Sequence, residues 1–431
     1  MHIYFSGIGG SGISSFALLA LEAGFQVSGS DRQDGAYFQY VKQHGITDIS
    51  LDQSGAFIAE THKNNPIDWF VYTSALSMEQ TESPEIRFCR ENGIRTSKRD
   101  EFLNMLLAEK NQKLIAIAGT HGKSTTTAMV VWLCKDAGLP ISYSLGAKVS
   151  FGDLSLFNQD SEYFVYECDE FDRNFLAFHP FLSPISGISW DHHEIYPTRE
   201  SYNQAFRDFI GQSQTTILWQ RDAEYVGVTA NDRIKVIDEH TPAIHELIIP
   251  GKFNREDAWI AMETVARMTG KPMESFKESM DRFPGLKQRM ELLAPHLYTN
   301  YAHTPEKIAG GMSASLEIAR ENNQDLVIIY EPLTNRRQHY IKDEYKDVFQ
   351  GAKKLYWVPS YLAREDPNLP ILTPAELITH LDNAEIAEPA ELDDALAARI
   401  REHLDKGDLV VAMDASGAGS LDEWLRQKFA A

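Results

Sequence analysis

The sequence has 431 residues, of which 43% are hydrophobic and 24% are charged, and its formal net charge at pH 7 is −21. This composition is typical of a globular protein, and the length predicts about three domains. The acidic excess argues against general nucleic-acid binding, and no apolar run is long enough for membrane insertion. The cysteines are odd in number and widely spaced, with Cys134 and Cys168 in apolar segments, which favours a reducing, cytoplasmic location.

The N-terminal segment predicts a strand, a glycine-rich turn, a helix and a second strand. The turn Gly7–Gly12 fits G-x-G-x-x-G, and the second strand ends at Gly29-Ser30-Asp31. Such a turn presents backbone N–H groups and a helix N-terminus to a diphosphate, and the acidic residue suits a ribose hydroxyl. The residues expected at the ligand are Gly9, Gly10, Ser11, Gly12, Ser30 and Asp31. By itself this pattern favours NAD, but a UDP-sugar stays open, because it also carries a diphosphate and a ribose.

A later strand over 68–72 ends in Thr73-Ser74-Ala75. Small residues at the carboxyl end of a parallel strand let a ligand approach the backbone. From the residues alone, Ser74 and Ala75 are equally consistent with a ligand contact and with a simple loop.

The most specific motif is the run from Gly119 to Ser124, Gly-Thr-His-Gly-Lys-Ser, between an apolar strand and a helix. It is a shortened phosphate-binding loop, since the general pattern has a glycine where Ile117 stands. In such a loop the backbone N–H groups surround phosphate, Lys123 reaches the outer phosphates, and the Ser124 hydroxyl binds Mg²⁺. The motif therefore predicts a nucleoside triphosphate site.

Two of the following strands lead into polar clusters. One ends at Glu167-Cys168-Asp169-Glu170, and the next is followed by Asp191-His192-His193. Parallel strands end at the same sheet edge as the phosphate loop, so both clusters are expected to face the nucleotide. We interpret a carboxylate and an imidazole from these clusters, together with Ser124, as a Mg²⁺ constellation, and one of the adjacent His192 and His193 as a bystander. A zinc site is not favoured, because neither CxxC nor HExxH spacing occurs.

The remaining chain continues the alternation of strands and helices. A polar linker near residue 110 and a crossing segment over 283–289 divide it into domains at 1–108, 109–286 and 287–431. The fold class is thus α/β, with three tandem parallel-sheet domains that are Rossmann-like or P-loop-like. The acidic run between Glu385 and Asp394 is interpreted as solvated surface.

Together these motifs resemble the Mur ligase family over nearly the whole chain. The resemblance rests on Gly7–Gly12, Gly29–Asp31, Thr73–Ala75, Ala118–Thr126 and the acidic run from Glu167 to Asp172 followed by Asp191-His192. It implies that the first domain binds UDP-N-acetylmuramate, that the second binds ATP and Mg²⁺, and that the third closes over ATP and helps hold the amine. The implied reaction joins the muramic-acid carboxylate to an amine through an acyl phosphate.

The resemblance also assigns residues. ATP would contact Gly119, Thr120, His121, Gly122, Lys123, Ser124, Thr125, Asn254, Arg289 and Asn300. Catalysis would involve Lys123, Glu167, His192, Arg289 and His303, with Ser124, Glu167 and His192 at the metal. The amino-acid carboxylate would meet His303 and Arg336, with the neighbouring Arg337 as the alternative, because arginine donates two parallel hydrogen bonds. Ser74 and Ala75 would join the UDP-sugar site.

No lysine lies between His192 and Lys235, where the resemblance places a modified lysine in later-step ligases; this fits the alanine-adding branch or the murein-tripeptide recycling ligase. We take the alanine-adding branch as the first hypothesis. The partners would then be UDP-N-acetylmuramate and L-alanine, and the protein a monomer or weak dimer. Phe253, Asn300 and Leu333 depart from the family pattern, which expects His, Asp and His there. The alternatives are a ligase that recycles murein tripeptide, a Rossmann-type NAD-binding redox protein, and a catalytically idle binding module.

Overall fold

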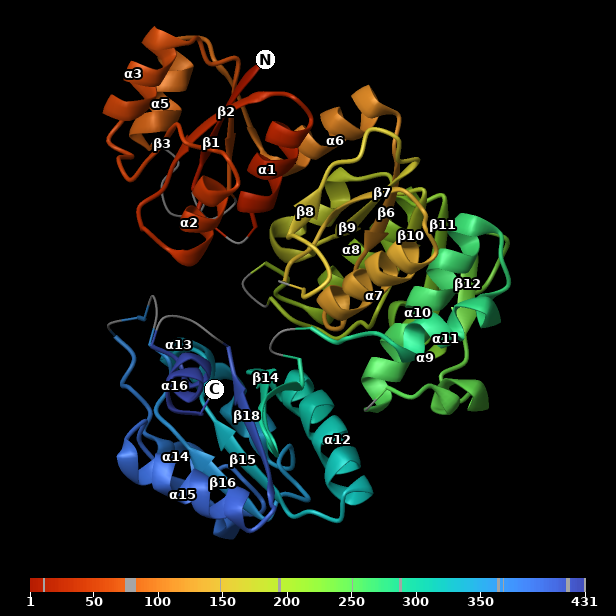
Figure 1. Ribbon diagram of the computed structural model, residues 1–431, viewed down its shortest axis with the longest axis vertical. Coiled ribbons are helices and arrows are strands. Elements are labelled where there is room, and N and C mark those ends of the chain that lie inside the picture. The colour runs from red at the N-terminus through yellow and green to blue at the C-terminus, as the bar shows by residue number, and fades with distance from the viewer. Residues whose placement is uncertain are drawn as a thin grey trace. The chain divides into compact units, whose positions relative to one another are not determined.

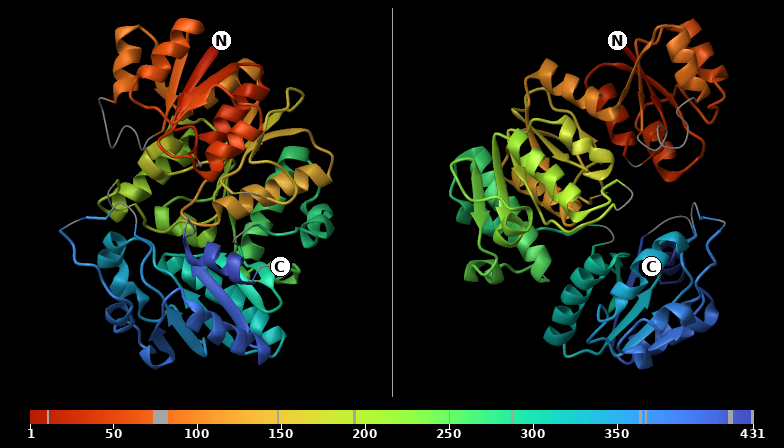
Figure 2. Two further views of the ribbon diagram at one scale, coloured as in Figure 1. Left: turned by 60° about the vertical axis from the view of Figure 1, so that its left-hand side comes forward. Right: turned by 180° about the vertical axis from the view of Figure 1, so that it is seen from behind.

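The computed structural model describes residues 1–10, 12–73, 83–147, 149–192, 195–249, 251–286, 289–362, 365–366, 368–415 and 419–429. The chain forms two compact units (Figures 1 and 2). Unit 1 comprises Met1–Thr241 and Asp257–Phe283, and unit 2 comprises Pro242–Glu256 and Pro284–Ala431. Unit 1 contains two of the three sheets and unit 2 contains the third.

The first sheet of unit 1 is parallel, in the order β3-β2-β1-β4-β5. Its strands are β1 (His2–Ser6), β2 (Gln26–Ser30), β3 (Ile49–Ser50), β4 (Trp69–Tyr72) and β5 (Arg95–Lys98). Its helices are α1 (Ser14–Glu22), α2 (Ala36–Gln43), α3 (Ala56–Asn64), α5 (Pro84–Glu91) and α6 (Arg99–Lys110). Alternate residues of β1 face opposite sides, so Ile3 and Phe5 pack with α1, α2 and α6, while Tyr4 packs with α3 and α5 (Figure 1).

The second sheet has the order β12-β11-β10-β6-β9-β7-β8, and only the edge strand β8 is antiparallel. Its strands are β6 (Lys113–Ile117), β7 (Ile141–Ser144), β8 (Ser155–Leu156), β9 (Tyr163–Glu167), β10 (Leu182–Pro184), β11 (Thr215–Trp219) and β12 (Ile234–Ile237). Its helices are α7 (Lys123–Asp136), η1 (Phe171–Ala177), α8 (Arg199–Gln212), α9 (Gln220–Val226), α10 (Lys252–Thr269) and α11 (Lys277–Asp281). One hydrophobic core runs from the first sheet into the second, because Phe16 of α1 packs edge-on against Tyr166 of β9.

The sheet of unit 2 has the order β13-β14-β18-β15-β16-β17, antiparallel only between β13 and β14. Its strands are β13 (Glu291–Ala294), β14 (Leu297–Tyr301), β15 (Leu326–Tyr330), β16 (Lys354–Trp357), β17 (Ala387–Pro389) and β18 (Leu409–Asp414). Its helices are α12 (Pro305–Glu321), α13 (Asn335–Ile341), α14 (Pro374–Ile378), α15 (Asp394–Asp405) and α16 (Leu421–Phe429). Helix α12 packs on one face and α15 and α16 on the other (Figure 2).

The predicted fold class is confirmed, since three mostly parallel α/β sheets are present. Several short strands were missed, including β3, β5 and β8, because two to four residues carry too little pattern. The acidic run from 385 to 394 was interpreted only as surface, but it contains β17, which pairs with β16. The domain boundaries at 108 and 286 stay predictions.

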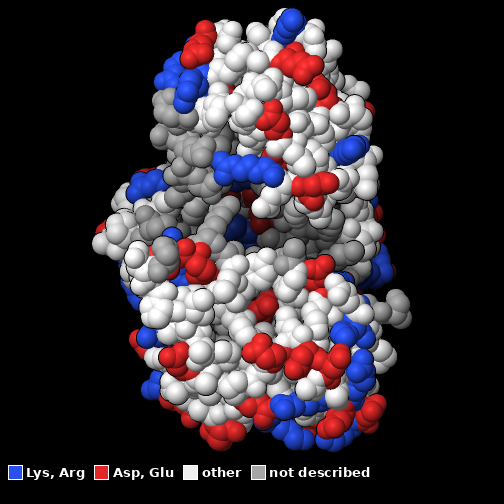
Figure 3. Space-filling model, turned by 90° about the vertical axis from the view of Figure 1, so that its left-hand side faces the viewer, with Lys and Arg blue, Asp and Glu red and all other residues white. Residues whose placement is uncertain are grey.

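All three cysteines are buried free thiols. Among the described residues, no helix combines the length and apolar character needed to cross a membrane. On the face drawn in Figure 3, acidic and basic side chains are interspersed among uncharged ones.

Candidate active site

The phosphate loop connects β6 to α7 and is fixed by its neighbours. Gly119 has φ +137° and Gly122 has φ +77°, values that disfavour residues with a side chain. A Cβ on Gly119 would lie 2.6 Å from Ser186 Oγ, and a Cβ on Gly122 would collide with the Asp257 carboxylate. The backbone N–H of Thr120 donates to Gly187 O at 2.7 Å. Both glycines therefore let the loop approach its neighbours closely.

Lys123 forms the central ion pair of this site. Its Nζ donates to Glu170 Oε2 at 2.7 Å and to Gly119 O at 2.5 Å. Burial lowers the pKa of Lys123, but the carboxylates of Glu170, Asp169 and Glu167 outweigh this effect and raise it above its usual value. Burial raises the pKa of Glu170, yet Lys123 and His192 lower it to about 2. Both groups are therefore ionised at neutral pH.

Ser124 and Glu167 are brought together as the strand-edge argument expected. Ser124 Oγ donates to Glu167 Oε1 at 2.8 Å, and the backbone N–H of Gly146 donates to Glu167 Oε2 at 2.8 Å. This contact joins the phosphate loop to the end of β9. The role of the pair as metal ligands stays a prediction.

His192 lies beside Glu170 in the structure. Its Nε2 is 3.5 Å from Glu170 Oε1, and its ring packs edge-on against Phe171. Burial lowers the pKa of His192, but Glu170 and Asp191 outweigh it, so the net shift is upward. His192 has φ 53°, a left-handed conformation that costs energy in a residue with a side chain.

Asp169, Glu170 and His192 present ligand atoms within 4.8 Å of one another. The residues fit a divalent cation, because Glu170 is fully buried and its Oε1 has no hydrogen-bond partner among the described residues. Glu167 is the carboxylate of this acidic run that the sequence predicts at the metal, whereas Asp169 and Glu170 are not among the predicted ligands. The run itself was visible, but spacing does not show which carboxylate turns toward the loop.

The other residues of the phosphate loop are held by structural contacts. Thr120 Oγ1 donates to Ser189 O at 2.7 Å and lies 2.6 Å from the Tyr202 hydroxyl. His121 accepts a hydrogen bond at its backbone oxygen from Ser186 Oγ. Thr125 is buried in the first turn of α7. The Thr120 hydroxyl, the Thr120 N–H and the His121 carbonyl are therefore engaged within the protein, and the predicted ATP contacts of these residues stay predictions.

The glycine-rich turn of the first sheet is tied to the end of β2. The N–H groups of Gly7 and Ile8 donate to Ser30 O at 2.8 and 2.9 Å. The N–H of Gly9 donates to Asp31 Oδ2 at 2.7 Å. Asp31 thus shapes the turn in this state, and its predicted ribose contact stays a prediction.

Ser30 lies in a buried hydrogen-bond cluster around Glu85. Glu85 accepts from Ser30 Oγ at 2.6 Å, Ser6 Oγ at 2.6 Å and Tyr4 OH at 2.8 Å. The Ser30 side chain is therefore engaged with the protein itself, a role that the sequence did not reveal. Of the other predicted UDP-sugar contacts, Gly10 and Gly12 are described, whereas Ser11, Ser74 and Ala75 lie outside the described residues.

Unit 2 carries the predicted residues His303, Arg289 and Asn300 at the carboxyl end of β14. The Arg289 guanidinium lies 4.6 Å from the Tyr301 ring centre, and the His303 ring packs edge-on against Tyr301. Burial, with Lys307, Arg337 and Arg289 nearby, lowers the pKa of His303 well below its usual value. His303 is therefore neutral, and its Nδ1 has no hydrogen-bond partner among the described residues.

Asn254 and Asn300 are both in unit 2, which includes the first residues of α10 up to Glu256. Asn300 is buried and accepts a hydrogen bond from the Met290 N–H at 3.2 Å. Asn254 lies in the first turn of α10, where its Nδ2 is 3.5 Å from the position of a Cβ on Gly251. Neither position is tested as a nucleotide contact, so both stay predictions.

The two candidate arginines for the amino-acid carboxylate differ in their surroundings. Arg336 is exposed, and its backbone N–H donates to Glu365 at 2.9 Å. Arg337 is half-buried and lies close enough to His303 to lower its pKa. The structure thus favours Arg337 over Arg336 as the partner of His303.

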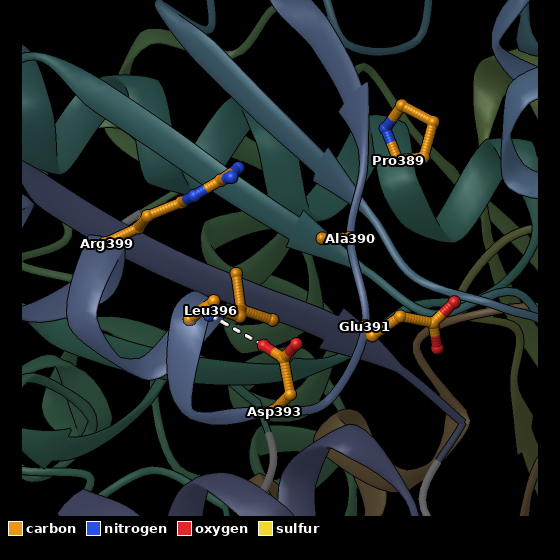
Figure 4. A pocket seen from close by; sticks show the side chains of 7 residues that line it. Pro389, Ala390, Glu391, Asp393, Leu396 and Arg399 are labelled. Carbon is orange, nitrogen blue, oxygen red and sulfur yellow. Dashed lines mark hydrogen bonds between the residues drawn. The ribbon is translucent and has the colours of Figure 1, made fainter.

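A cavity of about 240 Å³ lies in unit 2, between the end of β17 and the start of α15 (Figure 4). Its lining includes Glu391, Asp393 and Arg399, and Asp393 caps α15 by accepting from the Leu396 N–H at 2.9 Å. Among the predicted site residues that the structure describes, none lines this cavity.

Two profiles of one family match the sequence. The profile described as the Mur ligase family, catalytic domain, matches residues 2–111, and the Mur ligase middle domain matches residues 117–242. Together the two matches cover more than half of the chain.

Curated and solved relatives match along almost the whole length. The chain is 28% identical to the UDP-N-acetylmuramate–L-alanine ligase of Paenarthrobacter aurescens, over 97% of this chain and 94% of that protein. The structure of the UDP-N-acetylmuramate-alanine ligase MurC from Thermotoga maritima is similar, with TM-score 0.74, 21% identity, and coverage of 99% of this chain and 98% of that chain. A murein peptide ligase from Psychrobacter arcticus has TM-score 0.63 at 21% identity and covers 100% of both chains.

Proposed function

The chain belongs to the Mur ligase family, and we propose that it joins L-alanine to the carboxylate of UDP-N-acetylmuramate while ATP is cleaved to ADP and phosphate. The observation that carries the proposal is the arrangement in unit 1. A phosphate loop with a buried lysine meets the acidic run that ends β9. The name of the curated relatives supports alanine as the amine. A cytoplasmic location accords with a reaction that consumes ATP.

In the first step, a carboxylate oxygen of the sugar attacks the γ-phosphorus of ATP, and the bond to the β,γ-bridging oxygen breaks. The products are an acyl phosphate and ADP. Lys123 lies at the N-terminus of α7, where its charge and the helix N-terminus both favour the outer phosphates. Positioning and charge stabilisation are thus the main contributions of the protein.

A divalent cation such as Mg²⁺ would supply further charge neutralisation at the phosphates. Two sets of ligands fit it, namely Ser124 with Glu167, and Asp169 with Glu170 and His192. The two sets share one acidic run, so a single cation or two are both compatible with them.

In the second step, the amine of alanine attacks the acyl carbon, inorganic phosphate leaves, and the amine nitrogen loses a proton. His303 is our candidate acceptor for this proton, because its imidazole is neutral and its Nδ1 has no hydrogen-bond partner among the described residues; its lowered pKa makes it a weak base. Arg337 would hold the alanine carboxylate. Its half-buried position beside His303 supports this role.

The decisive experiment measures phosphate release with UDP-N-acetylmuramate, ATP and Mg²⁺. L-Alanine, glycine, L-serine and L-Ala-γ-D-Glu-meso-diaminopimelate are offered in parallel. We expect the highest kcat/KM with L-alanine. A clear preference for the tripeptide would establish the recycling ligase, which the similarity to a murein peptide ligase keeps as the second candidate.

Calorimetry separates the redox alternative from the ligase. UDP-N-acetylmuramate is expected to bind the purified protein, whereas NAD is expected to show no saturable heat. Tight NAD binding with no response to the UDP-sugar would contradict the proposed function.

A further inference from the structure

Arg99 occupies the junction between the first two sheets of unit 1. It is the first residue of α6, and its side chain is only 16% exposed. Its Nη1 donates to the Gly12 carbonyl at 2.5 Å, and its Nη2 lies 3.9 Å from Asp169 Oδ2. Its guanidinium also lies over the Phe16 ring, 5.7 Å from the ring centre. One buried cation therefore contacts the glycine-rich turn and the acidic run.

The absence of a side chain at Gly12 leaves space for the Arg99 guanidinium. A Cβ at Gly12 would collide with Arg99 Nη1, so any residue with a side chain would displace the guanidinium. In the usual dinucleotide turn, the third glycine serves close packing between helix and strand. Here it also leaves room for a cation that comes from α6.

The contacts continue from Arg99 to the phosphate loop. Asp169 is followed by Glu170, which pairs with Lys123 and lies beside His192. The neighbouring Lys98 pairs with Asp172, a residue with φ 53°. Two consecutive basic residues, Lys98 at the end of β5 and Arg99 at the start of α6, therefore pair with carboxylates of the acidic run.

We propose that Arg99 is a positioning residue that couples occupancy of the Gly7–Gly12 turn to cation binding at Asp169, Glu170 and His192. In the structure Arg99 shares its charge between the Gly12 carbonyl and the Asp169 carboxylate. A diphosphate at the turn is a stronger acceptor than a carbonyl and draws the guanidinium away from Asp169. The released carboxylate then binds a divalent cation more tightly. The inference rests on the proposed function, because the diphosphate is that of the UDP-sugar.

This coupling is measured without turnover. Mn²⁺ is titrated into the metal-free protein without ATP, and free Mn²⁺ is followed by electron paramagnetic resonance. UDP-N-acetylmuramate is expected to tighten Mn²⁺ binding to the wild type by about fivefold or more, the usual lower range for coupled sites. By reciprocity, Mn²⁺ should tighten UDP-sugar binding by the same factor.

Substitutions of Arg99 should change Mn²⁺ binding in a way that a general loss of structure would not. Arg99→Gln should bind Mn²⁺ more tightly than the wild type when no UDP-sugar is present, because Asp169 loses its competing cation. It should respond to the UDP-sugar by less than about twofold, below the usual range for coupled sites. Arg99→Lys keeps a positive charge but lacks the planar guanidinium. Without the UDP-sugar, its affinity for Mn²⁺ should therefore stay near that of the wild type, whereas the UDP-sugar should no longer tighten Mn²⁺ binding.

Arg95→Gln is the matched control. Arg95 lies on β5, with its guanidinium over the Trp69 ring and 3.6 Å from Glu101. Mn²⁺ binding to Arg95→Gln should be tightened by UDP-N-acetylmuramate as much as in the wild type. Weaker Mn²⁺ binding in Arg99→Gln, or a full response in Arg99→Lys, would overturn the coupling role.

Failure of the inference and failure of the proposed function are distinguishable. If the wild type binds UDP-N-acetylmuramate in calorimetry but its Mn²⁺ affinity does not change, the inference is wrong and the proposed function stands. If the wild type does not bind the UDP-sugar, the proposed function is wrong, and the inference is wrong with it.

Discussion

Glu331 is a buried carboxyl group whose ionisation works against the fold of unit 2. It follows β15, is only 4% exposed, and its Oε2 accepts from the Leu421 N–H at the start of α16 at 3.1 Å. Burial raises the pKa of Glu331 from 4.5 to about 8; the hydrogen bond from Leu421 opposes the shift and the nearby Asp414 adds to it. Glutamine has nearly the same shape as glutamate and carries no charge. Glu331→Gln therefore replaces an acid with an uncharged group of the same shape.

The sign of the pH effect follows from the raised pKa. The folded state keeps the proton up to about pH 8, whereas the unfolded chain releases it near pH 4.5. Stability is therefore greatest below the unfolded pKa and falls as the pH rises through this window. Because one pKa unit corresponds to about 1.4 kcal/mol, the full loss is about 5 kcal/mol, and the loss at pH 7 is about 3 kcal/mol. Such a loss is large beside a usual domain stability of about 5–15 kcal/mol.

Urea unfolding from pH 5 to pH 8.5 measures this contribution as a difference between proteins. Glu331→Gln should match the wild type within about 1 kcal/mol at pH 5 and exceed it by about 3 kcal/mol at pH 7. Glu385→Gln, at an exposed position of the same unit, is the control and should follow the wild type at every pH. A difference between Glu331→Gln and the wild type that stays constant with pH would refute the reasoning.

Three further substitutions test the candidate site. Lys123→Ala should lower the ligation rate more than tenfold, a barrier increase above about 1.4 kcal/mol, while calorimetric binding of the UDP-sugar persists; a smaller decrease would contradict its role. Glu85→Ala leaves three buried hydroxyls without an acceptor, so urea unfolding should show a loss of about 3 kcal/mol or more, and an unchanged midpoint would contradict the cluster's importance. Arg337→Ala should raise the KM for L-alanine at least tenfold with little effect on the KM for ATP, because a desolvated charge pair is worth about 2–5 kcal/mol. Arg336→Ala is its exposed control, and equal effects of the two would reject the preference for Arg337.

The fold and the loop positions were predictable because they depend on local backbone geometry. Glycines at fixed spacing after a strand specify a turn around Gly119 and Gly122, and apolar strands alternating with helices specify parallel sheets. The contact between Ser124 and Glu167 followed from a general rule, since parallel strands end at one sheet edge. These inferences needed no knowledge of how distant side chains pack.

Side-chain partners across the chain were not predictable. Glu170 lies three residues after Glu167, and only the turn after β9 decides which of the two meets Lys123. Arg99 is one of many basic residues in the sequence, and its contact with Gly12 joins residues 87 positions apart. The choice between Arg336 and Arg337 depends on the orientation of the short helix α13, for which adjacent arginines carry no signal.

The basic side chains near the phosphate loop are already paired with carboxylates, and this affects how an anionic ligand binds there. The sequence predicts Lys123 at the outer phosphates, but Lys123 is paired with Glu170, and Arg99 lies 3.9 Å from Asp169. If a phosphate replaced Glu170 as the partner of Lys123, the Glu170 carboxylate would stay buried without a paired cation. Leaving a buried charge unpaired costs several kcal/mol. A divalent cation that arrives with the phosphate removes this cost, because Glu170 belongs to the cluster that fits it. Binding of nucleotide and binding of metal are therefore expected to depend on each other at this site.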